Sequence, residues 1–301
     1  MRTPIARVLT SGGLGDVLLH TPAFRAWKMQ HPGGRLVVYC TSAKHREILR
    51  GNPYIDSLRL MTKWPFSLDA FPFTPQRLPQ NLLVANYSRL APGLYRIPAA
   101  RLIGEMLGVT VQTTTPEFYL TSAEDAQARE RLGALRIPVA IHTTPLCSPN
   151  KRWPREHWER LIEDSPEYDF VQVDDRDEPA VAGAHDLRGL PIRECFALIK
   201  HARAFIGVES GPAHAAAAVG VPSIVLFGPS TPEVWGHVGA THLSARPSCS
   251  PCIDTLYSGE CPYERRCMSS IAVSAVKNSL ISAVGNRLPS PVNEDVFAAS
   301  C

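Results

Sequence analysis

The sequence predicts an α/β protein with two doubly wound domains, in which helices cover both faces of a parallel β-sheet. The chain of 301 residues exceeds the usual size of one domain and is long enough for two hydrophobic cores. Short apolar runs rich in Val, Ile and Leu alternate with helical patterns along the chain, which is typical of parallel sheets buried on both faces. A glycine turn follows the first of these runs, as expected where a strand leads into a helix.

The first domain is expected over residues 1–118 and begins with a strand at 6–10, a glycine turn and a helical pattern that continues to about residue 30. Pro22 lies inside this pattern, so either the segment bends at the proline or the main helix begins with Thr21 as its cap. The Pro- and Phe-rich stretch 63–80 is expected to be an ordered loop that faces the cleft or a partner. The remaining elements are a strand at 35–40, a helix at 43–50, strands at 57–61 and 82–87, a helix at 99–107 and a structureless Thr-rich connection at 108–117.

The second domain is expected over residues 119–301 and opens with a helix at 122–132, where Ser122 and Asp125 have the spacing of a capping box. Strands and helices then alternate again. They are a strand at 139–143, a helix at 157–164, a strand at 170–174, a helix at 192–202, a strand at 204–208, a helix at 212–219, a strand at 223–227 and a final helix at 273–284.

The composition excludes several classes of protein. Hydrophobic residues make up 45% of the chain and charged residues 20%, which indicates a globular protein rather than a disordered one. The net charge of +3 is too small to indicate nucleic acid binding. The apolar run at 5–9 is too short for a signal peptide, and no apolar run reaches the length of a membrane span. We therefore expect a cytoplasmic protein, with at most peripheral contact at the inner face of a membrane.

The glycine turn after the first strand is a candidate ligand site, because open α/β sheets bind ligands at this position. Gly12, Gly13 and Gly15 leave the backbone unobstructed and present one carboxylate, Asp16. Leu18 stands where a dinucleotide fingerprint has its third glycine, so NAD or FAD binding is not expected. From spacing alone, Asp16 is either the N-cap of the next helix or a group offered to a ligand.

The segment 205–229 predicts an anion site at the start of a helix. Ser210 and Gly211 place outward-facing N–H groups at the helix N-terminus, where the helix dipole favours a phosphate. His214 can add a donor, or else lie on the helix surface beside a neighbour. Glu209 suits the hydroxyls of a sugar, or else serves as a simple cap.

The segment 150–154 adds Lys151 and Arg152 at the carboxyl end of the strand that opens the second sheet, just before a helix that Pro154 can start. Two cations at this edge can neutralise a diphosphate. A solvated basic turn is the alternative, and the nearby anion-binding turn argues against it.

Together the three segments resemble glycosyltransferase family 9, the heptosyltransferase family, in order and spacing. The residues that carry this resemblance are GGLGDVLLHTPAFRAW, NKRWPREHW and FIGVESGPAHAAAAVGVPSIVLFGPS. The resemblance implies a GT-B fold: two facing Rossmann-like domains with a cleft between them, the acceptor bound by the first and the nucleotide-sugar donor by the second.

The resemblance also implies roles for individual residues. Asp16 is the base that deprotonates the acceptor hydroxyl, Lys151 contacts the donor, and the backbone of 209–214 cradles phosphate, with Glu209 in place of the family's commoner Asp. By position Leu190 lies against the nucleobase and Glu178 near the ribose. Catalysis needs no metal in this arrangement, since helix N-terminus and cations stabilise the leaving diphosphate. The acidic segment 173–177 departs from the family's glycine-rich turn, and we expect it beside the base or ribose rather than the phosphates.

Four cysteines, Cys249, Cys252, Cys261 and Cys267, have the spacing of a metal site. A structural zinc or iron ion, one or two disulfides, and reduced buried thiols are the competing interpretations, and the metal is favoured over disulfides in a cytoplasmic protein.

The sequence thus favours an inverting glycosyltransferase that moves a sugar, with ADP-heptose as the preferred donor, to a glycan, glycolipid or protein acceptor, as in lipopolysaccharide biosynthesis. A nucleotide-sugar epimerase of the same fold and a non-catalytic nucleotide-sugar-binding scaffold are the alternatives. The epimerase would need acid and base groups on both sides of the sugar.

Overall fold

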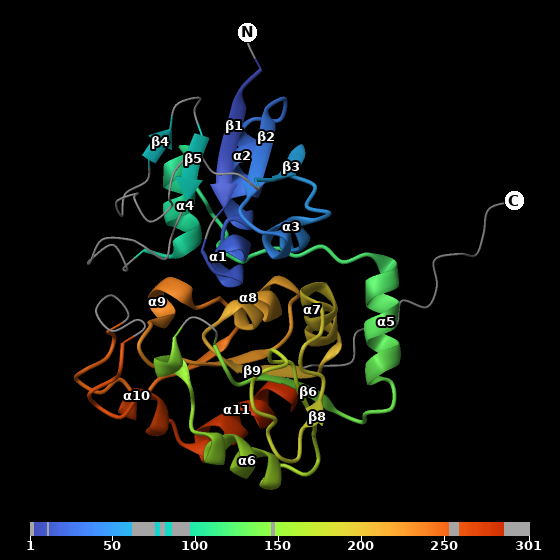
Figure 1. Ribbon diagram of the computed structural model, residues 1–301, viewed down its shortest axis with the longest axis vertical. Helices are drawn as coiled ribbons and strands as arrows, with labels where there is room; N and C mark the ends of the chain where they lie inside the picture. Colours follow the sequence, from blue (N-terminus) through green and yellow to red (C-terminus); the bar gives the residue numbers. More distant parts are fainter. Residues whose placement is uncertain are drawn as a thin grey trace, which may run out of the picture.

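The computed structural model describes residues 3–10, 12–61, 97–145, 148–252 and 259–285, together with the backbone of two strands at 76–78 and 82–85. The chain forms two lobes, each built around one sheet, with the first lobe above the second in Figure 1. Among the helices of these residues, none is both long and apolar enough to cross a membrane.

The first lobe has a five-stranded sheet in the order β3-β2-β1-β5-β4. All neighbouring strands run parallel except β4, which pairs with β5 in the antiparallel direction at the edge. The strands are β1 Ile5–Thr10, β2 Arg35–Cys40, β3 Ser57–Leu60, β4 Gln76–Leu78 and β5 Leu82–Ala85, and the helices are α1 Leu14–Leu18, α2 Thr21–Gln30, α3 Ala43–Leu49 and α4 Ala99–Leu107.

The second lobe has a parallel six-stranded sheet in the order β11-β10-β9-β6-β7-β8. Its strands are β6 Pro138–His142, β7 Asp169–Gln172, β8 His185–Asp186, β9 Ala204–Val208, β10 Ser223–Leu226 and β11 Thr241–Leu243. Its helices are α5 Ser122–Leu132, the 3-10 helix η3 Pro149–Lys151, α6 Arg155–Glu163, α7 Ile192–His201, α8 Gly211–Ala218, α9 Pro232–Trp235, α10 Arg266–Ser269 and α11 Val273–Gly285. In Figure 1, α7 and α8 lie on the side of this sheet that faces the first lobe, and α6 and α11 lie on the other side.

One hydrophobic core extends across both lobes. It contains Phe24 and Trp27 of α2 as well as Phe196 of α7, and the ring of Phe118 in the connection packs edge-on against Phe196 at 5.0 Å. A second core lies on the far face of the second sheet and includes Trp158 of α6. Because buried apolar surface is the main stabilising contribution in folding, the shared core holds the two lobes together.

The two lobes touch most closely where α1 meets α8. A Cβ atom added to Gly15 would lie 2.6 Å from Cδ2 of His214, and one added to Gly211 would lie 3.3 Å from the backbone nitrogen of Gly15. Only glycine permits so close an approach of two backbones. The N-terminal ends of these two helices are therefore brought to one place between the lobes.

The predicted alternation of strands and helices is confirmed, with differences at element ends. Pro22 neither bends one helix nor follows a Thr21 cap: α1 and α2 are separate helices, His20 caps α2, and the proline lies in its first turn. The helix predicted at 157–164 begins at Arg155, directly after Pro154. The predicted capping box of Ser122 and Asp125 is wrong by one position, since Thr121 is the N-cap and Glu124 completes the box.

The stretch 63–80 was expected to be a loop. Residues 76–78 instead form the edge strand β4, and the rest of the stretch lies outside the described residues.

A buried arginine on α7 ties the second lobe to the first lobe and to the connection. The Arg193 guanidinium donates to the carbonyl oxygens of Glu47 at 2.7 Å and Tyr119 at 2.6 Å, and to the Glu124 carboxylate at 2.5 and 2.8 Å. It also lies 4.9 Å from the centre of the Phe118 ring. Five separate contacts thus converge on one side chain that is only 6% exposed.

Glu124 predicts an acid-sensitive step in stability. Its hydrogen bond from Arg193 lowers its pKa from 4.5 to about 2. The stabilisation is at most roughly 3 kcal/mol, is fully present above the unfolded pKa of 4.5, and is lost as pH falls towards 2. Urea unfolding of the wild type and Glu124→Gln at pH 7 and pH 3 should therefore show a difference in unfolding free energy that shrinks at pH 3. An equal difference at both pH values would contradict the assignment.

Candidate functional site

Four ionisable side chains gather where α1 meets α8: Asp16 from the first lobe, and Lys151, Glu209 and His214 from the second. Lys151 Nζ lies 2.5 Å from Glu209 Oε2, and His214 Nε2 lies 3.7 Å from Glu209 Oε1. The side chains of these three second-lobe residues are at most 6% exposed. The structure therefore brings together four of the residues that the sequence nominated, from three separate segments.

Asp16 is the third residue of α1 and does not form its N-cap. Gly13 is the cap, and its N–H donates to Asp16 Oδ2 at 2.7 Å. The turn needs glycine at Gly12, where φ is +98° and an added Cβ would lie 2.5 Å from the same oxygen. Burial raises the pKa of Asp16 above its usual value, and the nearby Glu209 charge adds to this rise, against the Gly13 N–H, His214 and Lys151. Asp16 is thus a stronger base than an ordinary aspartate.

Glu209 lies at the carboxyl end of β9 and stays ionised. Burial alone would raise its pKa, but the Lys151 charge and His214 outweigh burial and hold the pKa of Glu209 well below its usual range. Lys151, at the end of η3, turns inward to this carboxylate. An anion that approaches Lys151 must therefore share the lysine with Glu209.

Arg152 points away from this group. Its side chain is 43% exposed, and its Nη2 lies 3.4 Å from Glu178 Oε2. Leu190 is half-buried and packs against the core shared by the lobes. The pair of cations predicted at Lys151 and Arg152 is thus divided, since one faces the buried group and the other joins Glu178 on the outside of the lobe.

Ser210 is the N-cap of α8, although its side chain makes no capping hydrogen bond. Its hydroxyl donates to the carbonyl oxygen of Val208 at 2.9 Å and lies 3.1 Å from His142 Nδ1. The hydroxyl is thereby held at the strand end, next to the helix N-terminus where Gly211 begins α8. The α8 dipole and its first N–H groups favour an anion at this point.

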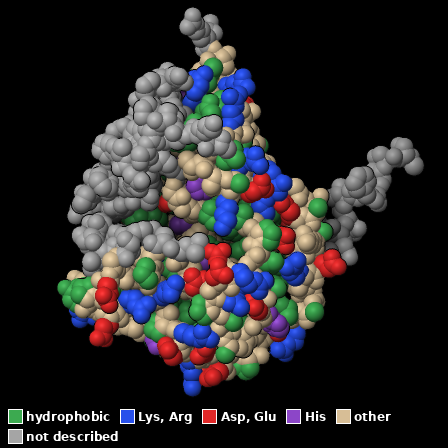
Figure 2. All heavy atoms as spheres, in the orientation of Figure 1, with side chains coloured by type: hydrophobic (Ala, Val, Ile, Leu, Met, Phe, Trp, Pro, Cys, Tyr) green, Lys and Arg blue, Asp and Glu red, His purple; other side chains and the backbone are tan. Residues whose placement is uncertain are grey.

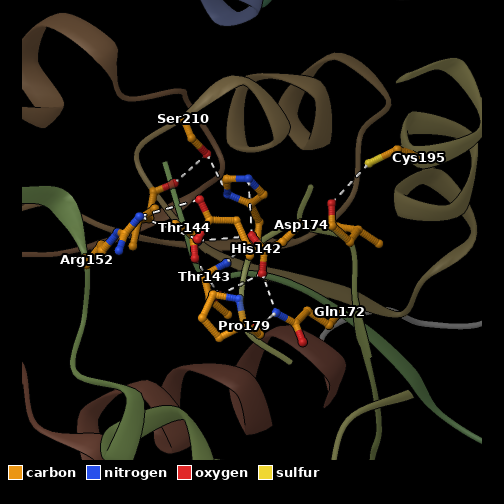
Figure 3. A network of polar contacts seen from close by, with 12 residues as sticks. His142, Thr143, Thr144, Arg152, Gln172, Asp174, Pro179, Cys195 and Ser210 are labelled. Atoms are coloured by element: carbon orange, nitrogen blue, oxygen red, sulfur yellow. Dashed lines mark hydrogen bonds and ion pairs between the residues drawn. The ribbon is translucent and has the colours of Figure 1, made fainter. Parts of the chain in front are cut away.

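Asp174 is buried near the site, in the acidic segment that the sequence analysis expected beside the base or ribose. Its carboxylate accepts from the N–H groups of Thr143 at 2.9 Å and Thr144 at 3.0 Å, from Thr143 Oγ1 at 2.6 Å and from Gln172 Nε2 at 2.7 Å. His142 Nε2 lies 3.4 Å from the same group (Figure 3). Asp174 thus fixes the turn after β6, whereas Asp175 and Asp177 are exposed. The prediction that this acidic segment as a whole faces a nucleotide is therefore wrong for Asp174.

His214 is buried and does not lie on the helix surface. Its partner is His237, which the sequence analysis missed, with His214 Nδ1 2.7 Å from His237 Nε2. His237 follows the short helix α9 in a stretch without periodic pattern or motif. Nothing in the sequence signals that it lies beside α8.

A cavity of about 330 Å³ lies between the turn after β6, the start of α6 and residues 264–269. Arg152, Arg155 and Arg265 line it together with apolar groups that include Trp153 and Val181. On the visible face of the second lobe, basic and acidic side chains are interspersed, and neither sign of charge gathers in one place (Figure 2).

The four clustered cysteines form no disulfide, and within the described residues no three Cys, His, Asp or Glu side chains converge closely enough to hold a metal ion. They nevertheless lie near one another. Burial raises the pKa of Cys267 to about 11, and the neighbouring Cys252, Cys249 and Cys261 add to this rise. The disulfide interpretation is not supported for these cysteines, and the metal remains a prediction.

Comparison with known proteins finds similarity to one family of glycosyltransferases. Residues 180–261 match the family model for glycosyltransferase family 9 (heptosyltransferase). The lipopolysaccharide heptosyltransferase 1 of Pseudomonas aeruginosa is 31% identical over 128 residues, which cover 38% of this chain and 36% of that protein. The match thus spans about a third of that curated relative.

Solved structures show the same fold over nearly the whole chain. A family 9 glycosyltransferase from Veillonella parvula superposes with a TM-score of 0.70 at 17% identity, covering 93% of this chain and 97% of that one. The dodecameric iron-containing heptosyltransferase TibC, in complex with ADP-D-beta-D-heptose, has a TM-score of 0.67 at 19% identity over 93% of this chain and 76% of its own. The chain therefore resembles glycosyltransferase family 9, the heptosyltransferase family, over residues 180–261, and it has the GT-B fold of two facing Rossmann-like domains.

Proposed function

We propose that the protein is an inverting glycosyltransferase that moves heptose from ADP-heptose to a hydroxyl of a glycan, glycolipid or protein acceptor. The observation that supports this most directly is the meeting of Asp16, from the first lobe, with Lys151, Glu209 and His214, from the second. A base from one lobe and anion-binding groups from the other are what sugar transfer across an interdomain cleft requires.

In the proposed reaction Asp16 takes the proton of the acceptor hydroxyl as that oxygen attacks the anomeric carbon of the donor sugar. The bond from this carbon to the diphosphate oxygen breaks, the nucleoside diphosphate leaves with the electron pair, and the configuration at the carbon inverts. Lys151, the α8 N-terminus at Ser210 and Gly211, and His214 stabilise the charge that develops on the diphosphate. No step of this scheme is assigned to a metal.

The partners follow the division of the chain into two units. We assign acceptor binding to residues 1–118, with the turn at Gly12, Gly13 and Gly15 beside it, and donor binding to residues 119–301. Support for an ADP-heptose donor comes from the TibC complex, whose fold this chain shares. Glu209 is proposed to bind hydroxyls of the donor sugar and Glu178 the ribose. Leu190 is proposed to contact the base, and Arg152 the diphosphate. We place the reaction in the cytoplasm, at or near the inner face of the membrane.

A thermal-shift titration with ADP, UDP, GDP and CDP tests the proposal, because a ligand that binds the folded state raises the melting temperature by mass action. Selective stabilisation by ADP and ADP-heptose is expected. A preference for UDP or GDP would remove the heptose assignment, and no response to any nucleotide would leave only a non-catalytic role.

Lys151→Met should weaken ADP binding about 10- to 100-fold, since a charged hydrogen bond to phosphate is lost and the Glu209 carboxylate beside it keeps only His214 of the two partners described above. The loss of the lysine from this buried carboxylate also lowers stability, so the measured quantity is the shift caused by ADP in each variant and not the melting temperature itself. Lys44→Met, at an exposed position on α3, is the matched control and should bind like the wild type. Unchanged ADP affinity in Lys151→Met would remove this lysine from the donor site.

We also propose a structural zinc or iron ion at Cys249, Cys252, Cys261 and Cys267. Support comes from their spacing, their mutual proximity and the iron content stated for TibC, while the described residues do not themselves supply a converged ligand set. Elemental analysis of protein purified without oxygen should find stoichiometric metal, which Cys267→Ser should lose and Cys195→Ser, in the core near Val173, should keep. Metal-free wild-type protein would contradict the proposal.

A further inference from the structure

His237 contacts the Nδ1 edge of the His214 ring, whereas the Nε2 edge of that ring faces Glu209. The two rings stand almost perpendicular, at 86°, with their centres 5.0 Å apart. Both side chains are buried, at 3% and 6% exposure. The contact of 2.7 Å between His214 Nδ1 and His237 Nε2 is a hydrogen bond, so one of these nitrogens must carry a proton and the other must not.

The surroundings of His237 determine whether the proton of this hydrogen bond is on His237 Nε2 or on His214 Nδ1. Burial, with His214 and His242 next in importance, lowers the pKa of His237 to about 3, so its ring is neutral and has a single N–H. Its Nδ1 is buried and has no hydrogen-bond partner among the described residues. A proton on Nδ1 would be a buried donor without acceptor, which folded proteins rarely tolerate. The proton therefore belongs on Nε2, which donates to His214.

The position of His237 is itself fixed from the opposite side. Its backbone N–H donates to His242 Nε2 at 3.2 Å, and the His242 ring packs against Gly236, where an added Cβ would lie 2.7 Å from that ring. His242 in turn packs edge-on against Phe227 of the core at 5.4 Å. The loop that holds His237 thus has little freedom to turn its donor away from His214.

The other edge of His214 faces the proposed site. With Nδ1 accepting from His237, the proton of a neutral His214 stands on Nε2, which lies 3.7 Å from Glu209 Oε1. A Cβ added to Gly15 would lie 3.3 Å from the same nitrogen, so Nε2 lies next to the first-lobe turn. In the opposite tautomer a lone pair would face Glu209 and any phosphate oxygen and would repel both.

We propose that His237 is a positioning residue that holds His214 in the Nε2–H tautomer, so that His214 donates a hydrogen bond to the diphosphate of the sugar donor. The inference deepens the proposed transferase function and rests on it for the identity of the ligand. His237 itself touches neither donor nor acceptor. His237 affects the reaction indirectly, because it determines which ring nitrogen of His214 carries the proton.

The tautomer can be measured without any substrate. Two-bond ¹H–¹⁵N correlation spectra of protein labelled at its histidines distinguish Nδ1–H from Nε2–H forms, and the His214 signals are assigned by their loss in His214→Gln. We expect wild-type His214 as the Nε2–H form. The Nδ1–H form in the wild type would overturn the proposal, whatever the His237 variants show.

Two substitutions then separate positioning from packing. The amide nitrogen of Gln can replace the Nε2–H donor, so His237→Gln should keep the His214 tautomer and stay within about threefold of wild-type kcat. His237→Met fills similar space without a donor, and should give mixed tautomers and roughly 10- to 100-fold lower kcat with an unchanged KM for the acceptor. Equal activity of the two variants would overturn the proposal. If His214 of the wild type is in the Nε2–H form but the protein binds no nucleotide, the transferase function is rejected. The hydrogen bond from His237 to His214 would still stand.

Discussion

Asp16→Asn should abolish sugar transfer and, at neutral pH, raise the melting temperature of the protein. The amide cannot take the proton of the acceptor hydroxyl, and loss of a general base costs roughly 10²- to 10⁴-fold in rate. Its oxygen can still accept from the Gly13 N–H, so the turn before α1 is preserved. Donor affinity should stay near that of the wild type, because the base acts on the acceptor.

The gain in stability follows from the sign of the pKa shift. Burial raises the pKa of Asp16 in the folded state above the value of 3.8. Ionised Asp16 therefore costs stability at every pH above that unfolded value, and the cost reaches its full size above the folded pKa. An uncharged amide avoids it, so the difference in melting temperature between Asp16→Asn and the wild type should be positive at pH 7 and vanish near pH 3.

Glu163→Gln, at an exposed position at the end of α6, provides the control and should change neither transfer nor the pH dependence of stability. Transfer within tenfold of the wild type in Asp16→Asn would remove Asp16 as the base. A stability difference independent of pH would show that the buried carboxylate is not the cause.

Arg193→Met should cause the largest loss of stability of any variant considered, roughly 3–5 kcal/mol in the free energy of unfolding. The change leaves the Glu124 carboxylate without its main partner and removes the donors that satisfy the carbonyl oxygens of Glu47 and Tyr119. Because these groups belong to α3, the connection and α5, the damage falls on the junction between the lobes.

Urea unfolding of three variants separates the charge from the packing. Arg193→Met with Glu124→Gln should recover part of the loss, since no unpaired charge remains, while each single variant should be less stable than the wild type. Arg203→Met is the control, an arginine outside the junction. A cost below about 1 kcal/mol for Arg193→Met, in the range of surface ion pairs, would show that the junction does not depend on this side chain.

The elements that the sequence predicted best carry their own end signals. The helix Ala99–Leu107 ends at Gly108, whose φ of +71° is a conformation that glycine adopts freely, and its predicted bounds are confirmed. The predicted bound of α6 at residue 157 was two residues late, although Pro154 was expected to start the helix. Pro154 is the N-cap and makes no side-chain hydrogen bond, so no polar residue marks the boundary. A helix end can thus be predicted where a residue with a distinct backbone preference, such as Gly108, stands at that end.

In the candidate site, too, some residues could be predicted from the sequence and others could not. Asp16, Lys151, Glu209 and His214 could be nominated because each lies shortly after a strand, in the following turn or in the first turn of the next helix, where α/β sheets bind ligands. The roles of Asp174 and His237 could not, because they depend on how strands and loops align. Asp174 reaches the Thr143 N–H only because β6 and β7 pair with Ile141 opposite Gln172. The Lys151–Glu209 ion pair likewise joins residues whose separation along the chain carries no pattern.

The contact of Gly15 with Gly211 also limits how this protein can diversify. Any side chain at Gly15 would meet the ring of His214, and any at Gly211 would meet the backbone of the facing turn, so neither position can drift without separating the two lobes. Substitutions that change the specificity for the proposed sugar or acceptor must therefore occur at positions other than these two glycines. Glu209 is one such position, because the length of its side chain can change while the backbones at Gly15 and Gly211 stay in contact.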